Sequence, residues 1–254
     1  MKTHFSMQSP DTRARACIVL PVYNEEAILE HSIRLLHAYC SSSLHEIEWV
    51  IIIADNGSRD ESSLIGKRLA SDFSRVHYIR RASLSKGGSI MEAWSLFDAD
   101  TYVFMDCDLA TDLKHLPQII SAVSVGAYDI AVGSRLAKGA STSRSILREL
   151  CSRLYGALPR FLFPSFPLLD CQCGFKAISH RVKKELLPLV IDDHLFFDTE
   201  LLIRGCIGGY RILEMPVDWR DQRYMKRKSK VRLIATAAGN IKKLIELKKK
   251  LNDK

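Results

Sequence analysis

Short, continuously apolar segments that alternate with longer helical patterns most constrain how this chain can fold. Strands that are apolar at every position are covered on both faces, as in a parallel sheet between helices. Between the first two segments, residues 25–39 place apolar side chains at helical spacing. The alternation predicts an α/β fold, a mostly parallel sheet flanked by helices. The expected strands are Ala16–Val22, Glu48–Asp55, Val76–Ile79, Thr101–Asp106 and Tyr128–Gly133.

Polar sequences follow four of these expected strands. The first strand runs into PVYNEE, the second into ADNGSRD, the fourth into DCDLATD and the fifth into GSR. Ligands of open α/β sheets bind at the carboxyl ends of the strands. We therefore expect a binding site along that edge of the sheet.

The acidic sequence DCDLATD carries the most specific chemistry. It gathers Asp106, Asp108 and Asp112 with Lys114 as a nearby cation. Such a cluster is either a solvated turn or a site for a cation. Hard divalent ions such as Mg²⁺ or Mn²⁺ take oxygen ligands and keep positions open for substrate phosphate. We expect Asp106 and Asp108 to bind such an ion, which would neutralise charge on a diphosphate leaving group.

Two further strand-to-helix sequences suit a nucleotide. SKGGS opens a helix with Lys86 and Gly87, and backbone N–H groups beside an ammonium favour a diphosphate. In ADNGSRD, Asp55 can accept hydrogen bonds from a nucleobase or ribose. Each sequence is also compatible with an ordinary turn, because Asn56-Gly57 and Ser58 are typical turn and helix-capping residues.

Positive charge is concentrated at the C-terminal end of the chain. The formal charge is +8, and the segment from Arg220 onward holds 13 Lys and Arg against three acids. A basic segment suggests an anionic partner or a solvated tail. Apolar residues recur there at helical spacing, which predicts a basic amphipathic helix on an anionic membrane surface. Alternatively, its apolar stripe packs on the body of the protein. The apolar positions are Val231, Ile234, Ala238, Ile241 and Ile245.

The remaining composition is that of a globular protein that does not cross a membrane by itself, which leaves peripheral contact open. The hydrophobic fraction is 47%, and no run approaches the ~20 apolar residues that span a bilayer. The apolar run 158–169 contains three prolines, and we expect it to enter the membrane beside the basic helix and receive the polyprenyl chain. Seven scattered cysteines and a start without an apolar signal core predict a cytoplasmic location. The spacing of Cys171 and Cys173 does not suit zinc.

At the level of motifs, the chain resembles the family 2 glycosyltransferases with a GT-A fold. PVYNEE, ADNGSRD, SKGG, DCD and VGSR occur in the family's order and spacing. DCDLATD, LLDCQCGFKA, FFDTELL and EMPVDW further resemble polyprenyl-phosphate sugar synthases, the glucose type slightly more than the mannose type. The resemblance covers roughly residues 16–235. It divides the chain into an N-terminal tail (1–15), a catalytic domain (16–225) and a basic loop with the C-terminal helix (226–254).

The resemblance implies a metal-dependent, inverting hexosyltransferase. The donor would be a UDP- or GDP-hexose, the acceptor polyprenyl phosphate, and the cofactor Mg²⁺ or Mn²⁺; no nucleic acid is expected. Asn56 replaces the second acid of a usual Asp pair, and Ala110 replaces a frequent glutamine. The implied donor-binding residues are Pro21, Tyr23, Asn24, Glu25, Asp55, Lys86, Gly87 and Asp106. Asp106 and Asp108 would bind the metal, Asp108, Arg135 and Asp198 would be catalytic, and Arg148, Ser152, Lys228 and Lys230 would bind the acceptor phosphate.

The chemical nature of the acceptor decides which residues are needed. A lipid phosphate has a second pKa near ~6, so it is already nucleophilic and needs cations such as Arg135 and Arg148. A glycan hydroxyl would need a carboxylate base. Asp198 or Glu200 can take that part, although Asp198 equally suits a role at a helix N-terminus. A non-catalytic nucleotide- or membrane-binding module is a third reading, which the acidic and basic site residues disfavour.

Overall fold

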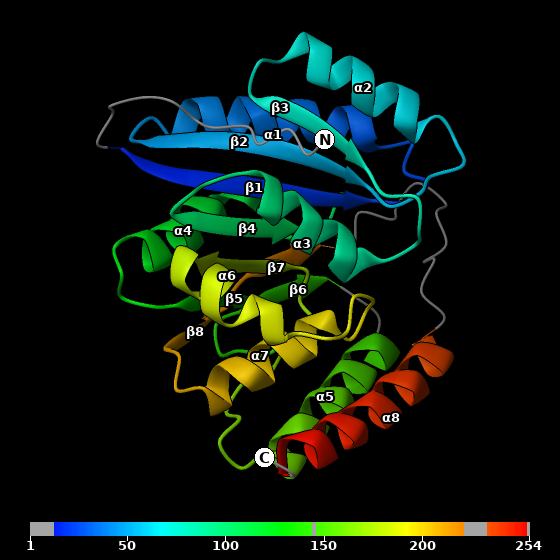
Figure 1. Ribbon diagram of the computed structural model, residues 1–254, viewed down its shortest axis with the longest axis vertical. Coiled ribbons are helices and arrows are strands. Elements are labelled where there is room, and N and C mark those ends of the chain that lie inside the picture. Colours follow the sequence, from blue (N-terminus) through cyan, green and yellow to red (C-terminus); the bar gives the residue numbers. More distant parts are fainter. Residues whose placement is uncertain (1–12, 144–145, 221–232, 253–254) are drawn as a thin grey trace.

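The computed structural model describes residues 13–143, 146–220 and 233–252. Its centre is a seven-stranded sheet in the order β3-β2-β1-β4-β7-β5-β8 (Figure 1). Only β7 runs against its neighbours; it is antiparallel to both β4 and β5. The predicted mostly parallel α/β fold is therefore confirmed. The strands are β1 (Ala14–Val22), β2 (Ile47–Asp55), β3 (Val76–Arg80), β4 (Thr101–Met105), β5 (Ile130–Ser134), β7 (Phe175–Ser179) and β8 (Ile212–Pro216).

The five strands expected from the sequence are all present, each with ends within two residues of the prediction. β1 and β2 are paired over their whole length, from Ala14 opposite Ile47 to Val22 opposite Asp55. Their carboxyl ends therefore coincide, and the loops that follow them leave the sheet side by side. β7 and β8 were not among the predicted strands; part of each was quoted only within the motifs LLDCQCGFKA and EMPVDW.

Helices cover both faces of the sheet and enclose two cores. Alternate side chains of β1 enter opposite cores. Ile18 and Leu20 belong to the first core, and Cys17 and Val19 belong to the second. Trp94 is fully buried in the second core. The first core is covered by α1 (Leu29–Ser43), α2 (Ser62–Asp72) and α4 (Leu116–Ser124). The second is covered by α3 (Lys86–Leu96), α6 (His180–Glu185) and α7 (Phe197–Ile207).

Two longer helices, α5 (Ile146–Leu162) and α8 (Leu233–Asn252), lie side by side at the end of the molecule away from α2 (Figure 1). Leu244 and Leu247 of α8 are buried in the same core as Trp94. Ile241 and Ile245 of α8 stay 37% and 45% exposed. One stripe of α8 thus packs on the body of the protein, and an adjoining stripe faces outward. No helix among the described residues is long and apolar enough to cross a membrane.

The proline-containing apolar run behaves differently from the prediction. α5 continues through Pro159 to Leu162, and Phe161 is 85% exposed. Phe163, Phe166 and Leu168, however, are buried in the core beside α7. The expectation that this run enters the membrane is wrong for these three side chains, because they complete the core.

Short elements close the structure near the acidic turn. β6 (Ser141–Ser143) and β9 (Asp218–Arg220) form a separate parallel pair. An isolated bridge joins Thr111 to Trp219, so the chain after β4 is fastened to the chain after β8. Two 3₁₀ helices, η1 (Leu113–His115) and η2 (Leu187–Leu189), complete the described elements.

Candidate functional site

The acidic turn begins directly at the carboxyl end of β4. Asp106 N–H donates to the carbonyl of Gly174, 2.9 Å away, which ties the turn to the segment before β7. Leu109 has a positive φ of 49°, and Ala110 N–H donates to Asp108 Oδ1 at 3.2 Å. The Asp106 side chain is 45% exposed. The predicted turn therefore exists and presents Asp106 at the surface of the sheet edge.

Lys86 brings a positive charge to this turn from the first position of α3. Its Nζ donates to Asp106 Oδ1 at 3.0 Å and lies 3.9 Å from Asp198 Oδ2. Burial alone would lower the pKa of Lys86, but the Asp106 and Asp198 carboxylates outweigh it and hold the pKa above its usual range. Lys86 therefore stays charged at neutral pH, beside the acidic turn.

Asp198 is buried between two lysines in the first turn of α7. The Nζ of Lys176, a residue with no exposed surface, donates to Asp198 Oδ1 at 2.8 Å and to the carbonyl of Cys173. The Asp198 side chain is 5% exposed. The helix has Phe196 as its N-cap and no side-chain cap hydrogen bond, so Asp198 does not cap it.

Lys176 was missed as a site residue in the sequence, where it appeared only inside the motif LLDCQCGFKA. Its signal was a lysine at the second position of the short strand FKAIS, between the apolar residues Phe175 and Ala177. A buried ammonium requires an opposite charge. The sequence offers many carboxylates for that role, and only the fold identifies Asp198 as the partner.

Arg135, at the end of β5, forms a buried fork with Asp170. Its backbone N–H, Nε and Nη2 donate to the Asp170 carboxylate at 3.0, 2.7 and 2.9 Å. Burial would raise the pKa of Asp170, but Arg135 holds it below the usual range. The backbone N–H of Asp170 donates to Glu214 at 2.8 Å, which fixes the acid in turn. Asp170 thus holds Arg135 inside the protein, and a contact of Arg135 with substrate phosphates stays a prediction. Asp170 was not identified as a site residue from the sequence.

The loops after β1 and β2 bind each other. Asn24, which has a φ of 54°, accepts from Arg59 N–H at 2.7 Å and donates its own N–H to Ser58 Oγ at 2.9 Å. Glu25 N–H donates to Ser62 Oγ at 2.7 Å. The predicted donor residues Pro21, Tyr23, Asn24 and Glu25 therefore lie together at the end of β1, beside the loop that carries Asp55.

Asp55 is bonded inside this loop. Its Oδ1 accepts from Ser58 N–H at 2.8 Å and its Oδ2 from the Tyr78 hydroxyl at 2.6 Å. The side chain has no exposed surface. Burial and the Asp55 hydrogen bond raise the pKa of Tyr78 to about 12. In this structure Asp55 shapes the loop, and its contact with a base or ribose stays a prediction.

The start of α3 is packed tightly against the start of α7. Ser85 caps α3 by accepting from Gly88 N–H at 3.2 Å, and its own N–H donates to Asn56 Oδ1. A Cβ at Gly87 would lie 2.6 Å from the Cβ of Phe197. Gly87 is therefore required by the close approach of two helices, and a contact with diphosphate remains a prediction.

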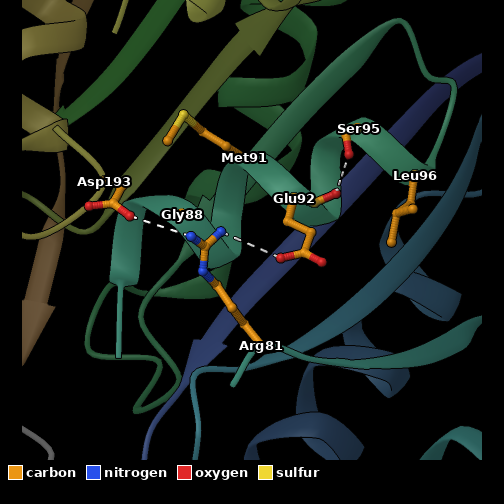
Figure 2. A pocket seen from close by; sticks show the side chains of 7 residues that line it. All are labelled: Arg81, Gly88, Met91, Glu92, Ser95, Leu96 and Asp193. Atoms are coloured by element: carbon orange, nitrogen blue, oxygen red, sulfur yellow. Dashed lines mark hydrogen bonds and ion pairs between the residues drawn. The ribbon is translucent and has the colours of Figure 1, made fainter. Parts of the chain in front are cut away.

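A pocket of about 480 Å³ lies along the outer side of α3 (Figure 2). Arg81 reaches across it between Asp193 and Glu92, with 3.5 Å to each carboxylate. Its lining includes none of Asp106, Asp108 and Lys86. The pocket is thus separate from the acidic turn, and its charges are already paired.

The predicted acceptor residues are only partly described. Arg148 and Ser152 both belong to α5, as expected from their spacing, and Ser152 is partly exposed. The Arg148 side chain lies outside the described part of the structure. Lys228 and Lys230 fall in residues 221–232, which are also outside it. Their roles stay predictions.

The comparison with known proteins decides the family. The model of glycosyl transferase family 2 matches residues 17–187, more than half of the chain. The chain belongs to glycosyl transferase family 2. The predicted membership is confirmed; the matched residues include Asp55, Lys86 and Asp106, whereas Asp198 lies beyond them.

Two named proteins are relatives of this family 2 chain. Glycosyltransferase AglD of Haloferax volcanii is 38% identical over 223 residues, which are 87% of this chain and 35% of AglD. Dolichyl-phosphate beta-glucosyltransferase of Saccharomyces cerevisiae is 25% identical over 227 residues, 80% of this chain and 66% of that enzyme. The chain spans between about a third and two thirds of the length of these two relatives.

Among solved structures, this family 2 chain is similar to glucosyl-3-phosphoglycerate synthase from Mycobacterium tuberculosis in complex with UDP. The TM-score is 0.66 at 18% identity, and the match covers 92% of this chain and 80% of the other. Further structures of that enzyme contain Mn²⁺ with UDP-glucose or Mg²⁺ with UDP. The likeness shows the shared GT-A fold.

The acidic turn of this family 2 chain fits a divalent ion that is bound partly by the protein and partly by a substrate. Mg²⁺ is commonly bound by one or two carboxylates together with substrate phosphates. Asp106 and Asp108 provide two, while Lys86 uses one oxygen of Asp106. Within the described residues, no cluster of three His, Cys, Asp or Glu side chains could hold a metal alone.

The thiols of Cys171 and Cys173 are not suited to bind zinc in this structure. Burial raises the pKa of both thiols to about 12, so both stay protonated at neutral pH.

Proposed function

We propose that this family 2 glycosyltransferase moves a hexose from a nucleotide sugar to polyprenyl phosphate, with inversion at the anomeric carbon. The choice of acceptor rests on one observation: the two carboxylates of α7, Asp198 and Glu200, are buried and bonded to cations. Asp198 is held by Lys176 and Lys86. Glu200 accepts from Arg204 at 2.7 Å and from Asp192 N–H at 2.8 Å.

A glycan hydroxyl must lose a proton to a base that reaches it. Asp198 and Glu200 are 4% and 3% exposed as residues, and both are bonded to cations. Neither presents a carboxylate oxygen to an incoming hydroxyl. A phosphate monoester is largely dianionic at neutral pH and attacks without a base. The arrangement therefore favours the phosphate acceptor over the glycan hydroxyl.

The transfer itself exchanges one bond for another. A phosphate oxygen of the acceptor forms a bond to the anomeric carbon while the bond from that carbon to the nucleoside diphosphate breaks on the opposite side. No proton moves in this step. Asp106 and Asp108 would hold a Mg²⁺ or Mn²⁺ ion, which supplies positive charge to the leaving diphosphate. Lys86, beside Asp106, adds a second positive charge there.

The donor and acceptor sites follow from the same arrangement. The loops after β1 and β2 and the start of α3 would bind the nucleotide, with UDP-glucose as the first candidate and GDP-mannose as its competitor. Two observations support the glucose type, namely the dolichyl-phosphate beta-glucosyltransferase relative and the UDP-bound structural neighbour. Arg135, Arg148, Ser152, Lys228 and Lys230 would bind the acceptor phosphate. The basic α8 would bring the protein to an anionic membrane, on its cytoplasmic face.

A transfer assay with radiolabelled sugar tests the proposal. UDP-glucose and GDP-mannose are each combined with polyprenyl phosphate or a free glycan, in Mg²⁺, Mn²⁺ or EDTA. We expect labelled lipid from one donor, and only when metal is present. Asp108→Ala should lower the rate ~10²–10³-fold, because the charge that stabilises the leaving group is lost.

Asp112→Ala is the matched control for that variant. Asp112 belongs to the same acidic sequence, but its oxygen accepts from Lys114 N–H at 3.0 Å and starts η1. Its loss should change stability and leave metal dependence intact. Labelled glycan without labelled lipid would favour the hydroxyl acceptor, and full activity in EDTA would contradict the metal role of Asp106 and Asp108.

A further inference from the structure

The C-terminal helix α8 is bonded to the loop that leads into α7. Lys243 Nζ donates to Asp192 Oδ2. Asp192 Oδ1 in turn accepts from the N–H groups of His194 and Phe196, at 2.9 and 3.2 Å. The loop 190–196 is thus shaped by an acid whose charge is balanced by α8. The Asp192 side chain is 11% exposed and that of Lys243 is 38% exposed, so the acid is largely buried while the ammonium partly faces water.

The next residue of the same loop is bonded to the start of α3. The Asp193 carbonyl accepts from Gly88 N–H at 2.8 Å and from Ser85 Oγ at 2.5 Å. Its carboxylate lies 3.5 Å from Arg81, at the end of β3 (Figure 2). Ser85 and Gly88 flank Lys86, whose ammonium contacts Asp106. A short, continuous set of polar contacts therefore joins α8 to the acidic turn.

A second anchor on the same face of α8 leads to the same place. Asn240 is 6% exposed and is hydrogen-bonded to the Tyr155 hydroxyl of α5. That hydroxyl lies 3.1 Å from Thr199 Oγ1, which accepts from Gln172 Nε2 at 2.9 Å. Thr199 follows Asp198 in the first turn of α7. Both anchors of α8 thus end beside the residues that hold Lys86.

We propose that Lys243 and Asp192 are positioning residues for sugar transfer: they fix loop 190–196 and, through it, the start of α3 that places Lys86 at Asp106. α8 is then a part of the catalytic unit, whether or not it also contacts a membrane. The inference rests on the proposed function for the identity of the donor. It does not depend on the nature of the acceptor.

Two adjacent lysines of α8 separate this role from a general effect of charge. Lys243 contacts Asp192, whereas Lys242 is 81% exposed and lies 4.0 Å from Glu246. Lys243→Met and Lys242→Met each remove one positive charge and keep an unbranched side chain in the helix. If α8 acts only by attracting anionic lipid, the two variants behave alike. If Lys243 positions the site, only Lys243→Met has an effect in the absence of lipid.

The experiment is calorimetric titration of the full chain with UDP-glucose and Mg²⁺ in lipid-free buffer. Contacts along such a network typically modulate binding ~3- to 30-fold, so we expect that loss of affinity for Lys243→Met. Lys242→Met should stay within about twofold of the parent protein. Lys243→Arg, which can still donate to Asp192, should recover most of the affinity. Equal affinities of Lys243→Met and Lys242→Met would overturn the proposal.

Hydrogen exchange without any ligand separates this proposal from the proposed function. Lys243→Met should raise amide exchange in residues 190–196 and 85–88, and Lys242→Met should not. If the parent protein binds no nucleotide sugar but shows this pattern, the function is wrong and the mechanical link stands. If Lys243→Met is too unstable for titration, Asp192→Asn keeps the hydrogen-bond acceptor for the loop and removes only the charge pair. Unchanged exchange in both variants would refute the link.

Discussion

Four charged side chains alternate in sign around the acidic turn. Lys176, Asp198, Lys86 and Asp106 follow one another with contacts of 2.8, 3.9 and 3.0 Å. Each buried charge therefore has an opposite neighbour, which offsets the free energy lost on removing it from water. The outermost member, Asp106, is the one that remains accessible, and it is the one that would meet a metal.

Arg135 and Asp170 form a second pair, for which the pH dependence can be predicted. Arg135 holds the pKa of Asp170 below its usual range. The pair therefore stabilises the fold fully above the unfolded pKa of about 4, and the contribution is lost as pH falls through the lower folded pKa. Asp170→Asn should lower the free energy of unfolding by ~3–5 kcal/mol at pH 7, because it leaves a buried guanidinium without its charge partner.

Urea denaturation of both proteins between pH 7 and pH 3 measures this difference. It should be largest at neutral pH and shrink below about pH 4. Asp98→Asn is a suitable control, because Asp98 is 58% exposed and 3.3 Å from Arg15. Surface pairs contribute only ~0–1 kcal/mol. A deficit of Asp170→Asn that stays constant over the whole pH range would contradict the assigned cause.

Among the elements, β7 explains which parts of the structure the sequence could predict. The five leading strands were recognisable because each is a local apolar run, and the acidic turn because its carboxylates are adjacent in sequence. The pairs Lys176–Asp198 and Arg135–Asp170 join residues 22 and 35 positions apart. They depend on β7 lying between β4 and β5, which no local pattern specifies. The hydrogen bond from the Tyr78 hydroxyl to Asp55 was also missed, because the two residues lie on different strands and only the fold brings them together.

Gly174, just before β7, gives a prediction about an element that touches no substrate. A Cβ at this position would lie 2.0 Å from Asp106 Oδ2, so Gly174→Ala must displace the Asp106 carboxylate or shift the start of β7. The β4–β7 ladder begins only at Phe175 opposite Met105 and can remain intact. We expect a modest loss of stability, ~1–3 kcal/mol, together with at least ~10-fold weaker binding of nucleotide sugar with Mg²⁺.

Gly205→Ala separates the two effects of Gly174→Ala. A Cβ at Gly205 would lie 2.9 Å from Ile130 Cδ1, inside the core and away from Asp106. This variant should lose similar stability by overpacking and keep its affinity for nucleotide sugar. Thermal unfolding and calorimetric titration of both variants give the comparison. Equal binding by Gly174→Ala and the parent protein would show that Asp106 is not constrained by this contact.

For the whole molecule, exposed apolar side chains of two adjacent helices gather at one end. Leu150, Leu154 and Phe161 of α5 are 52%, 62% and 85% exposed, and their spacing of four and seven places them on one side of the helix. Ile241 and Ile245 of the adjacent α8 are also exposed. Lysines of α8 supply positive charge beside them. A truncation before α8 would be a poor test, because Leu244 and Leu247 belong to the core.

Point substitutions test membrane contact without opening that core. Phe161→Ser should reduce co-sedimentation with anionic liposomes ~10-fold, since burial of such a side chain in an apolar phase contributes ~1.5–3 kcal/mol. Leu64→Ser is the matched control: Leu64 is 66% exposed on α2, at the opposite end of the molecule (Figure 1). Equal loss of binding by both variants, or by neither, would exclude α5 from the membrane contact.

The position of β7 also sets the order in which this protein becomes competent as it is made. β1 to β4 are neighbours and can pair once residue 105 has left the ribosome, whereas β5 hydrogen-bonds only to β7 and β8, which are synthesised later. During synthesis the chain emerges from its N-terminal end. A nascent chain therefore carries Asp106 and Lys86 long before Asp170, Lys176 and Asp198 join them. The set of paired charges around the acidic turn is therefore completed only once residue 198 has emerged.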